Sequence, residues 1–284
     1  MIKIENLKKK YNNFTALNDI SFDVKKGNFY SLLGKNGAGK STTIGILTSL
    51  IKKDSGKIFI KNYDFDKNIS QIKSLIGFMP QEYNFNQFET VIDIITNQAG
   101  FYGIKKCDSM KNADFLLKKF DLCDFKFSTS ITLSGGLKRR LMLIRSLIHN
   151  PEILILDEPT AGVDIISRRL IWDYLKEINI NGKTIILTSH YIEEIEKLCT
   201  DVAIIDKGNI LLKAKIADLT NNINDKTFIL DIEEKNITTQ IEISLNKNES
   251  LNDKLNLLIK KNIQIKNIKS KTNNLEDLFI KLTS

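Results

Sequence analysis

A glycine-rich run that ends in a lysine and two hydroxyl residues, GKNGAGKST, occupies residues 34–42. It lies between apolar segments at residues 30–33 and 43–47, an order that predicts a strand, a tight turn and a helix. In such a turn the backbone N–H groups and the positive end of the helix dipole face one concavity, which suits phosphate oxygens. The motif gives Lys40 to the β- and γ-phosphates and the Ser41 hydroxyl to Mg²⁺. The run therefore predicts a nucleoside-triphosphate site built from Gly34, Lys35, Asn36, Gly37, Ala38, Gly39, Lys40, Ser41 and Thr42.

Two adjacent carboxylates, Asp157 and Glu158, follow the apolar run at residues 153–156, which is typical of a buried parallel strand. Buried acids are costly without partners, so a pair in this position indicates a role. Asp157 could hold the water shell of a metal ion while Glu158 polarises an attacking water. That division of labour is the one that hydrolysis of a phosphoanhydride needs.

Two further polar residues stand at the ends of predicted strands, where open α/β sheets hold ligands. Gln81 follows the strand expected at residues 76–79, and its amide could ligate Mg²⁺ or position water. Taken without the neighbouring motifs, it would be interpreted as an exposed glutamine without a role. His190 follows the strand expected at residues 184–188 and could contact a γ-phosphate, whereas His149 precedes Asn-Pro at a helix end and is interpreted as structural.

A second possible anion-binding helix terminus is formed by LSGGL at residues 133–137, directly before an amphipathic helix expected at residues 138–148. A plain helix cap is the alternative. Tyr11 is expected in a loop between strands at residues 2–7 and 20–24 of a small antiparallel sheet. Its ring could stack on a nucleobase or be a partly buried loop tyrosine, and spacing alone leaves both open.

The composition is that of a folded chain without export or membrane signals. The 284 residues are 42% hydrophobic, and their net charge of +8 is compatible with nucleic acid, anionic lipid or a merely basic surface. Three distant cysteines without CxxC spacing argue against disulfides or zinc and favour a reducing cytoplasm. No signal peptide and no apolar run of ~18 residues is present, so any membrane role is expected to come through a partner.

The pattern changes twice along the chain. From residue 82 to about residue 130 it becomes helical and rich in aromatic residues, which predicts an inserted helical subdomain with these aromatics as its core; a groove for a partner helix is the lesser alternative. A polar, asparagine-rich stretch at residues 217–225 is interpreted as a linker. Beyond it, alternating and helical periods predict a small α+β appendage without a catalytic constellation.

Together the motifs resemble the ATP-binding subunit of ABC transporters over roughly residues 1–215. Seven features in the family's order carry the likeness: Tyr11 (A-loop), GKNGAGKST (Walker A), Gln81 (Q-loop), LSGGL (signature), ILILDE (Walker B and its glutamate), AGVD (D-loop) and His190 (H-loop). The wording around SGGLKRRL, DEPTAGVD and LTSHYIEEIEKLC resembles the bacterial ABC-2-type exporter subfamily. Leu137 departs from the family, which more often has glutamine after the two glycines.

The resemblance implies an α/β fold: a P-loop NTPase (RecA-like) core with an antiparallel β subdomain, an inserted α-helical subdomain at about residues 82–150 and a small α+β C-terminal domain. The ATPase domain would span residues 1–217 and the accessory domain residues 218–284.

The resemblance also implies residue roles. ATP and Mg²⁺ would be the ligands, with Tyr11 on the adenine and with Ser41, Gln81 and Asp157 at the metal. Glu158 would be the general base, assisted by Lys40, Gln81 and His190. The signature and D-loop residues would bind the nucleotide of a second cassette: Ser134, Gly135, Gly136 and Asp164.

The likeness further implies a subunit that couples ATP hydrolysis to export through a separate ABC-2-type permease, peripheral on the inner face of the cell membrane and paired with a second cassette as a homodimer. The groove for the permease's coupling helix would lie in the helical segment. The alternative is a soluble ABC-type ATPase that acts on nucleic acid or ribosomes. A single cassette, no sustained heptads and no aromatic-basic surface favour export, with no nucleic acid expected.

Overall fold

The structure is a computed structural model that describes residues 1–221, 226–234, 237–245, 250–260, 263–271 and 275–283. The chain divides into two compact units, Met1–Lys213 and Ala214–Ser284. The boundary expected from the sequence lies after residue 217, close to this division. All candidate site residues belong to the first unit.

A six-stranded sheet forms the centre of the first unit, with strand order β10-β9-β3-β8-β7-β6. The pairs from β9 through β6 are parallel. Every residue of β3, β7 and β8 is buried, as expected for a parallel sheet that is covered on both faces. The strands are β3 (Phe29–Leu33), β6 (Ile76–Met79), β7 (Ile153–Asp157), β8 (Thr184–Ser189), β9 (Asp201–Asp206) and β10 (Asn209–Lys215).

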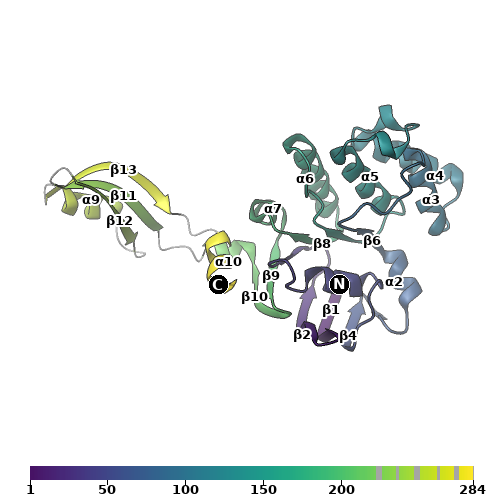
Figure 1. Ribbon diagram of the computed structural model, residues 1–284, viewed down its shortest axis with the longest axis horizontal. Helices are drawn as coiled ribbons and strands as arrows, with labels where there is room; N and C mark the ends of the chain where they lie inside the picture. Colours follow the sequence, from purple (N-terminus) through teal and green to yellow (C-terminus); the bar gives the residue numbers. More distant parts are fainter. Residues whose placement is uncertain (222–225, 235–236, 246–249, 261–262, 272–274, 284) are drawn as a thin grey trace. The chain divides into compact units, whose positions relative to one another are not determined.

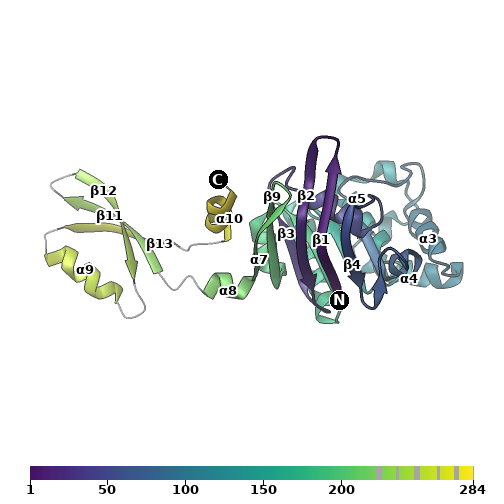
Figure 2. The ribbon, with the colours of Figure 1, turned by 90° about the horizontal axis from the view of Figure 1, so that it is seen from below.

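A four-stranded sheet of order β2-β1-β4-β5 covers one face, with helix α1 (Lys40–Leu47) in the layer between the sheets (Figures 1 and 2). Its β1–β2 and β1–β4 pairs are antiparallel. The main core fills this layer and joins aliphatic side chains of both sheets, among them Ile4, Leu17, Leu32, Ile155 and Ile186. The strands are β1 (Ile2–Tyr11), β2 (Phe14–Val24), β4 (Ser55–Ile60) and β5 (Tyr63–Asp64).

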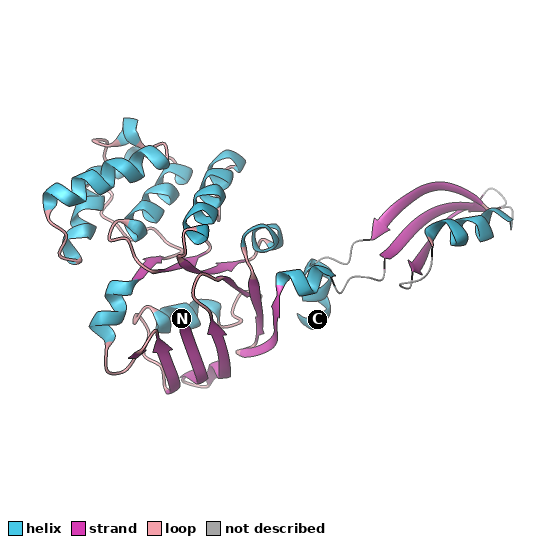
Figure 3. Ribbon diagram, turned by 180° about the vertical axis from the view of Figure 1, so that it is seen from behind, coloured by secondary structure: helices cyan, strands magenta, loops and turns pink. Residues whose placement is uncertain are grey.

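Helices cover the opposite face of the six-stranded sheet (Figure 3). They are α5 (Gly135–Leu147), α6 (Ile165–Ile180) and α7 (Ile192–Leu198). Because parallel strands connected by crossovers all point the same way, residues that follow β3, β6, β7 and β8 gather at one edge of the sheet. That edge is where the predicted site residues lie.

The inserted helical segment holds α3 (Val91–Phe101) and α4 (Lys106–Lys119), which pack with α5; α2 (Ile69–Leu75) precedes it. Its core is mainly aliphatic: Val91, Ile95, Ala99, Leu116 and Leu117 are buried, together with Phe120 at the C-terminal end of α4. The prediction of an aromatic core was wrong for most of the aromatics, because their side chains do not face this core. Phe88 is 70% exposed and Phe101 86% exposed, and Tyr83 and Phe115 are also exposed.

The second unit contains a three-stranded antiparallel sheet of order β12-β11-β13, with α9 along it (Figure 1). The predicted linker was wrong at its start, since residues 217–221 belong to helix α8; residues 222–225 lie outside the described residues. None of the helices in the described ranges has both the length and the apolar character that a membrane crossing requires. The elements are α8 (Ile216–Asn221), β11 (Lys226–Glu234), β12 (Ile237–Leu245), α9 (Leu251–Lys260), β13 (Gln264–Lys271) and α10 (Leu275–Thr283).

Candidate active site

The glycine-rich loop connects β3 to α1, as the sequence predicted, and two of its glycines are required by close backbone approaches. A Cβ on Gly34 would lie 2.4 Å from the carbonyl oxygen of Ile205. Gly39 has φ 112°, and a Cβ there would lie 2.7 Å from the carbonyl oxygen of Ala16. Side chains at these positions would force the loop away from the sheet, so the anion-binding concavity depends on glycine.

Lys40 is the first residue of α1 and is only 6% exposed. Its Nζ donates to the carbonyl oxygens of Gly34, at 2.7 Å, and Lys35, at 3.1 Å, so the side chain curves back over the loop. Burial lowers the pKa of Lys40, and the carboxylates of Glu158 and Asp157 oppose this shift. The ammonium group thus lies at the loop, where phosphate oxygens would supply stronger acceptors than carbonyls.

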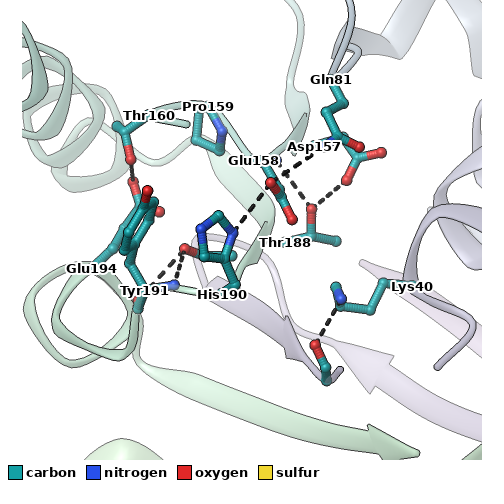
Figure 4. Close-up of polar contacts among 12 residues, drawn as sticks. Lys40, Gln81, Asp157, Glu158, Pro159, Thr160, Thr188, His190, Tyr191 and Glu194 are labelled. Carbon is teal, nitrogen blue, oxygen red and sulfur yellow. Dashed lines mark hydrogen bonds and ion pairs between the residues drawn. The ribbon is translucent and has the colours of Figure 1, made fainter. Parts of the chain in front are cut away.

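Asp157 and Glu158 are both buried and share one partner, Thr188 on the neighbouring strand β8 (Figure 4). Parallel pairing places Thr188 opposite Asp157. The Thr188 hydroxyl group donates to Asp157 Oδ1 and accepts from the backbone N–H of Glu158 at 3.1 Å. Sequence reasoning missed Thr188; the available signal was a hydroxyl residue near the end of an apolar strand.

The carboxylate of Glu158 lies between two other residues that the sequence singled out, Gln81 and His190 (Figure 4). Its Oε2 lies 3.2 Å from Nδ1 of His190 and accepts from Nε2 of Gln81 at 3.4 Å. His190 is partly exposed, and its ring packs against Tyr191 with centroids 4.0 Å apart. A carboxylate held between an imidazole and an amide, next to a lysine-bearing phosphate loop, is suited to act as a general base for the attack of water on a bound phosphoanhydride.

Two buried charged residues next to this cluster were also missed. Arg139 on α5 donates to the carbonyl oxygens of Gln81, Glu158 and Pro159. The sequence showed Arg139 only as part of a basic run, because carbonyl partners leave no trace in residue type.

The second missed residue is Glu194 on α7. Its Oε1 accepts from the Thr160 hydroxyl and from Nε1 of Trp172, both at 2.8 Å. Burial raises the pKa of Glu194. Glu194 therefore connects the loop that follows Glu158 with helices α6 and α7.

The signature residues lie at the N-terminus of α5, on the surface of the protein. Ser134 caps the helix, its Oγ accepting from the N–H of Leu137 at 3.4 Å, and both Ser134 and Gly135 are exposed. Gly136 faces the start of α6, where a Cβ on it would lie 3.2 Å from Oδ2 of Asp164. Asp164 caps α6, and hydrogen bonds from Ser167 lower its pKa. The predicted signature and D-loop residues are thus neighbours within one chain and are accessible to a second molecule.

Tyr11 was expected in a loop after a strand at residues 2–7, and that expectation was wrong, because β1 continues to Tyr11 as its last residue. The pairing of Tyr11 with Phe14 extends the hairpin to a two-residue turn. The ring is 43% exposed, with Nζ of Lys9 5.1 Å from its centroid. Its role toward a nucleobase stays a prediction.

The comparisons with known proteins decide the family. Residues 17–161 match the family model described as ABC transporter. The chain is 39% identical over 229 residues to the linearmycin resistance ATP-binding protein LnrL of Bacillus subtilis, covering 81% of this chain and 74% of that protein. The chain belongs to the ABC transporter family.

Other relatives of this ABC cassette agree. It is 34% identical to the Nod factor export ATP-binding protein I of Ralstonia nicotianae, with 77% of this chain and 68% of that protein covered. A solved dimer of the ATP-binding cassette MJ0796 with ADP and Pi superposes with a TM-score of 0.71 at 27% identity, over 76% of this chain and 98% of the other. The fold is therefore that of a P-loop ATPase cassette, and the chain binds and hydrolyses ATP.

Proposed function

We propose that this cassette is the ATP-hydrolysing subunit of an ABC-2-type exporter and that it works with a separate membrane permease on the inner face of the cell membrane. The convergence of Gln81 and His190 on the Glu158 carboxylate, beside a complete phosphate loop, is the observation that supports an active ATPase. Export is supported by the relatives, one named for linearmycin resistance and another for Nod factor export.

In this proposal Glu158 is the general base for the attacking water. Its backbone is fixed by hydrogen bonds, and its carboxylate lies between Gln81 and His190, so no large rearrangement is needed before it accepts a proton. Lys40 stabilises negative charge on the phosphates, and His190 contacts the γ-phosphate. The Tyr11 ring stacks on the adenine.

The oxygen donors present fit Mg²⁺, which prefers a few carboxylate, hydroxyl and amide oxygens together with phosphates and waters. Ser41, Gln81 and Asp157 supply such atoms, and Asp157 is already oriented by Thr188. When bound, the ion would neutralise charge that develops on the phosphates.

A cavity between the helical segment and the sheet is the proposed binding site for the permease's coupling helix. Its volume is about 200 Å³, and its lining includes Pro80 next to Gln81, Gln98 of α3, Tyr102 directly after α3, and Arg145 of α5. Arg145 already joins both sides, since it donates to Gln98 and to Asn84. A helix inserted here would touch the segment that carries Gln81.

The experiment is co-purification of the Glu158→Gln protein from detergent-solubilised membranes in ATP and Mg²⁺, with partners identified by mass spectrometry. Glutamine keeps the shape of the side chain but cannot act as the base, so kcat should fall by about 10²-fold or more with ATP still bound. A multi-span membrane protein is the expected partner.

Lys40→Ala is the matched control, because it removes the phosphate-binding ammonium and should weaken nucleotide binding itself. It should therefore lose any partner whose capture depends on ATP. Recovery of ribosomes or nucleic acid without a permease would instead support the alternative function. Unchanged hydrolysis by Glu158→Gln would remove Glu158 from the role of base.

A further inference from the structure

Arg139 is a buried cation whose hydrogen bonds all go to backbone carbonyl groups around the catalytic glutamate. It is 3% exposed. Its Nε donates to the Pro159 oxygen at 3.1 Å, one terminal nitrogen donates to the Gln81 oxygen, and the other donates to the Glu158 oxygen. Burying a guanidinium is costly, and three acceptors in fixed directions offset that cost only while the two loops keep their places.

The Glu158 backbone needs such support. Its φ is 50°, in the left-handed region, a strained conformation for a non-glycine residue that persists only where surrounding contacts enforce it. On one side the Glu158 N–H donates to the backbone oxygen and hydroxyl group of Thr188, both at 3.1 Å. On the other side its carbonyl group accepts from Arg139. The peptide that aims the carboxylate is therefore held from both ends.

The same guanidinium holds Gln81, whose side chain reaches the Glu158 carboxylate at 3.4 Å. Arg139 thus sets the separation of the two backbone segments that bring the amide and the carboxylate together. It lies on α5, one turn after the helix begins at Gly135 behind the Ser134 cap. A tilt of this helix would move the Arg139 side chain and, through it, both loops.

We propose that Arg139 is a positioning residue for ATP hydrolysis, which fixes the backbones of Gln81 and Glu158 and makes their geometry depend on the placement of α5. The inference rests on the proposed roles of Glu158 as base and of Gln81 beside it. Arginine is required because its planar fork donates in three separate directions, whereas a lysine ammonium is a single point that cannot reach all three oxygens.

Arg140 is the matched control, since it carries the same group at the next position of the same helix. Its guanidinium donates to the Phe120 carbonyl oxygen and the Ser167 hydroxyl group, and it contacts neither Gln81 nor Glu158 in the described structure. The full-length Arg139→Lys, Arg139→Gln and Arg140→Lys proteins are compared for kcat, KM for ATP, equilibrium binding of a non-hydrolysable ATP analogue, and Tm.

We expect each Arg139 substitution to lower kcat by about 10- to 100-fold, because a misplacement of ~1 Å is costly for catalysis, with analogue affinity within about threefold of wild type. Arg140→Lys should keep kcat within about threefold. In a Gln81→Ala background Arg139→Lys should cost less than it does alone, because part of its effect passes through Gln81.

The outcomes separate this inference from the proposed function. If Glu158→Gln is inactive while both Arg139 variants keep the wild-type kcat, the inference is overturned and the base assignment stands. If the Arg139 variants show weaker analogue binding and a lower Tm together with a lower kcat, Arg139 only stabilises the fold, and the inference is likewise overturned. If Glu158→Gln hydrolyses ATP at the wild-type rate, the proposed base itself fails.

Discussion

The Thr188 hydroxyl group serves both buried acids at once, donating to Asp157 and accepting from the Glu158 backbone. A single hydroxyl can do so because it is donor and acceptor together. Asp157 is a proposed metal ligand, so the direction of its free lone pairs depends on which oxygen Thr188 holds. Thr188 therefore links the orientation of the metal-binding acid to that of the base.

Thr188→Val should lower kcat by about tenfold, because valine matches the shape but leaves a buried carboxylate oxygen without its donor. The unpaired acceptor should also reduce the free energy of unfolding by ~1–3 kcal/mol. Steady-state kinetics and urea unfolding measure the two effects. Thr188→Ser, which keeps the hydroxyl, is the control and should restore most of kcat; equal losses in both variants would contradict the assignment.

At the scale of elements, Glu194 joins three segments by accepting from Thr160 in the loop after β7 and from Trp172 on α6 while it lies on α7. Residue type alone does not reveal this, because the glutamates of a short charged helix such as residues 192–198 usually face solvent. The structure shows Glu194 fully buried. The loop between the base and the Asp164 cap is thereby fixed to the helix that follows His190.

Because burial raises the folded-state pKa of Glu194 above its ordinary value near 4.5, the folded protein retains this proton to higher pH than the unfolded chain does. Its contribution to stability is complete below that value and is lost as pH rises through the folded-state pKa. Glutamine accepts the same two hydrogen bonds without charge. We expect the stability of Glu194→Gln relative to wild type to increase from pH 5 to pH 8 in thermal unfolding.

The control for this pH effect is Glu194→Leu, which leaves both buried donors unpaired. It should be less stable than Glu194→Gln at every pH, by ~2 kcal/mol or more. A stability difference between Glu194→Gln and wild type that does not change with pH would show that Glu194 titrates alike in the folded and unfolded states.

At the scale of the whole molecule, the exposed Ser134 and Gly135 have no nucleotide of their own to contact in the proposed mechanism. The solved MJ0796 cassette is a dimer with ADP and Pi. A second cassette would bring its bound ATP to these residues, as the family resemblance implies. The complete site is then shared between two chains.

In ATP and Mg²⁺, the Glu158→Gln protein should sediment as a dimer, because nucleotide held between two cassettes is not turned over. Adding Ser134→Arg should leave it a monomer that still binds ATP, since the bulky side chain would occupy the surface offered to the opposite nucleotide. Analytical ultracentrifugation with and without ATP makes the measurement. A dimer that persists in the double variant would place the signature outside the interface.

The sequence by itself determined the parts of this protein that depend on local backbone chemistry. The glycines of the phosphate loop, Lys40, and the acids after a buried strand follow from turn geometry, helix dipoles and the cost of burying charge, and each lies where those rules place it. The parallel strands and most helices could be predicted from the periodicity of apolar residues, which is also a local property of the sequence.

Only the tertiary structure decided which groups meet across the sheet. Thr188 faces Asp157 because of strand register, and Arg139 reaches three carbonyl oxygens because α5 packs above them. Carbonyl partners are common to every residue and so leave no pattern to read. The exposed aromatics of the helical segment could not be predicted either. Which apolar residues form its core depends on how the helices pack, and hydrophobicity alone does not determine it.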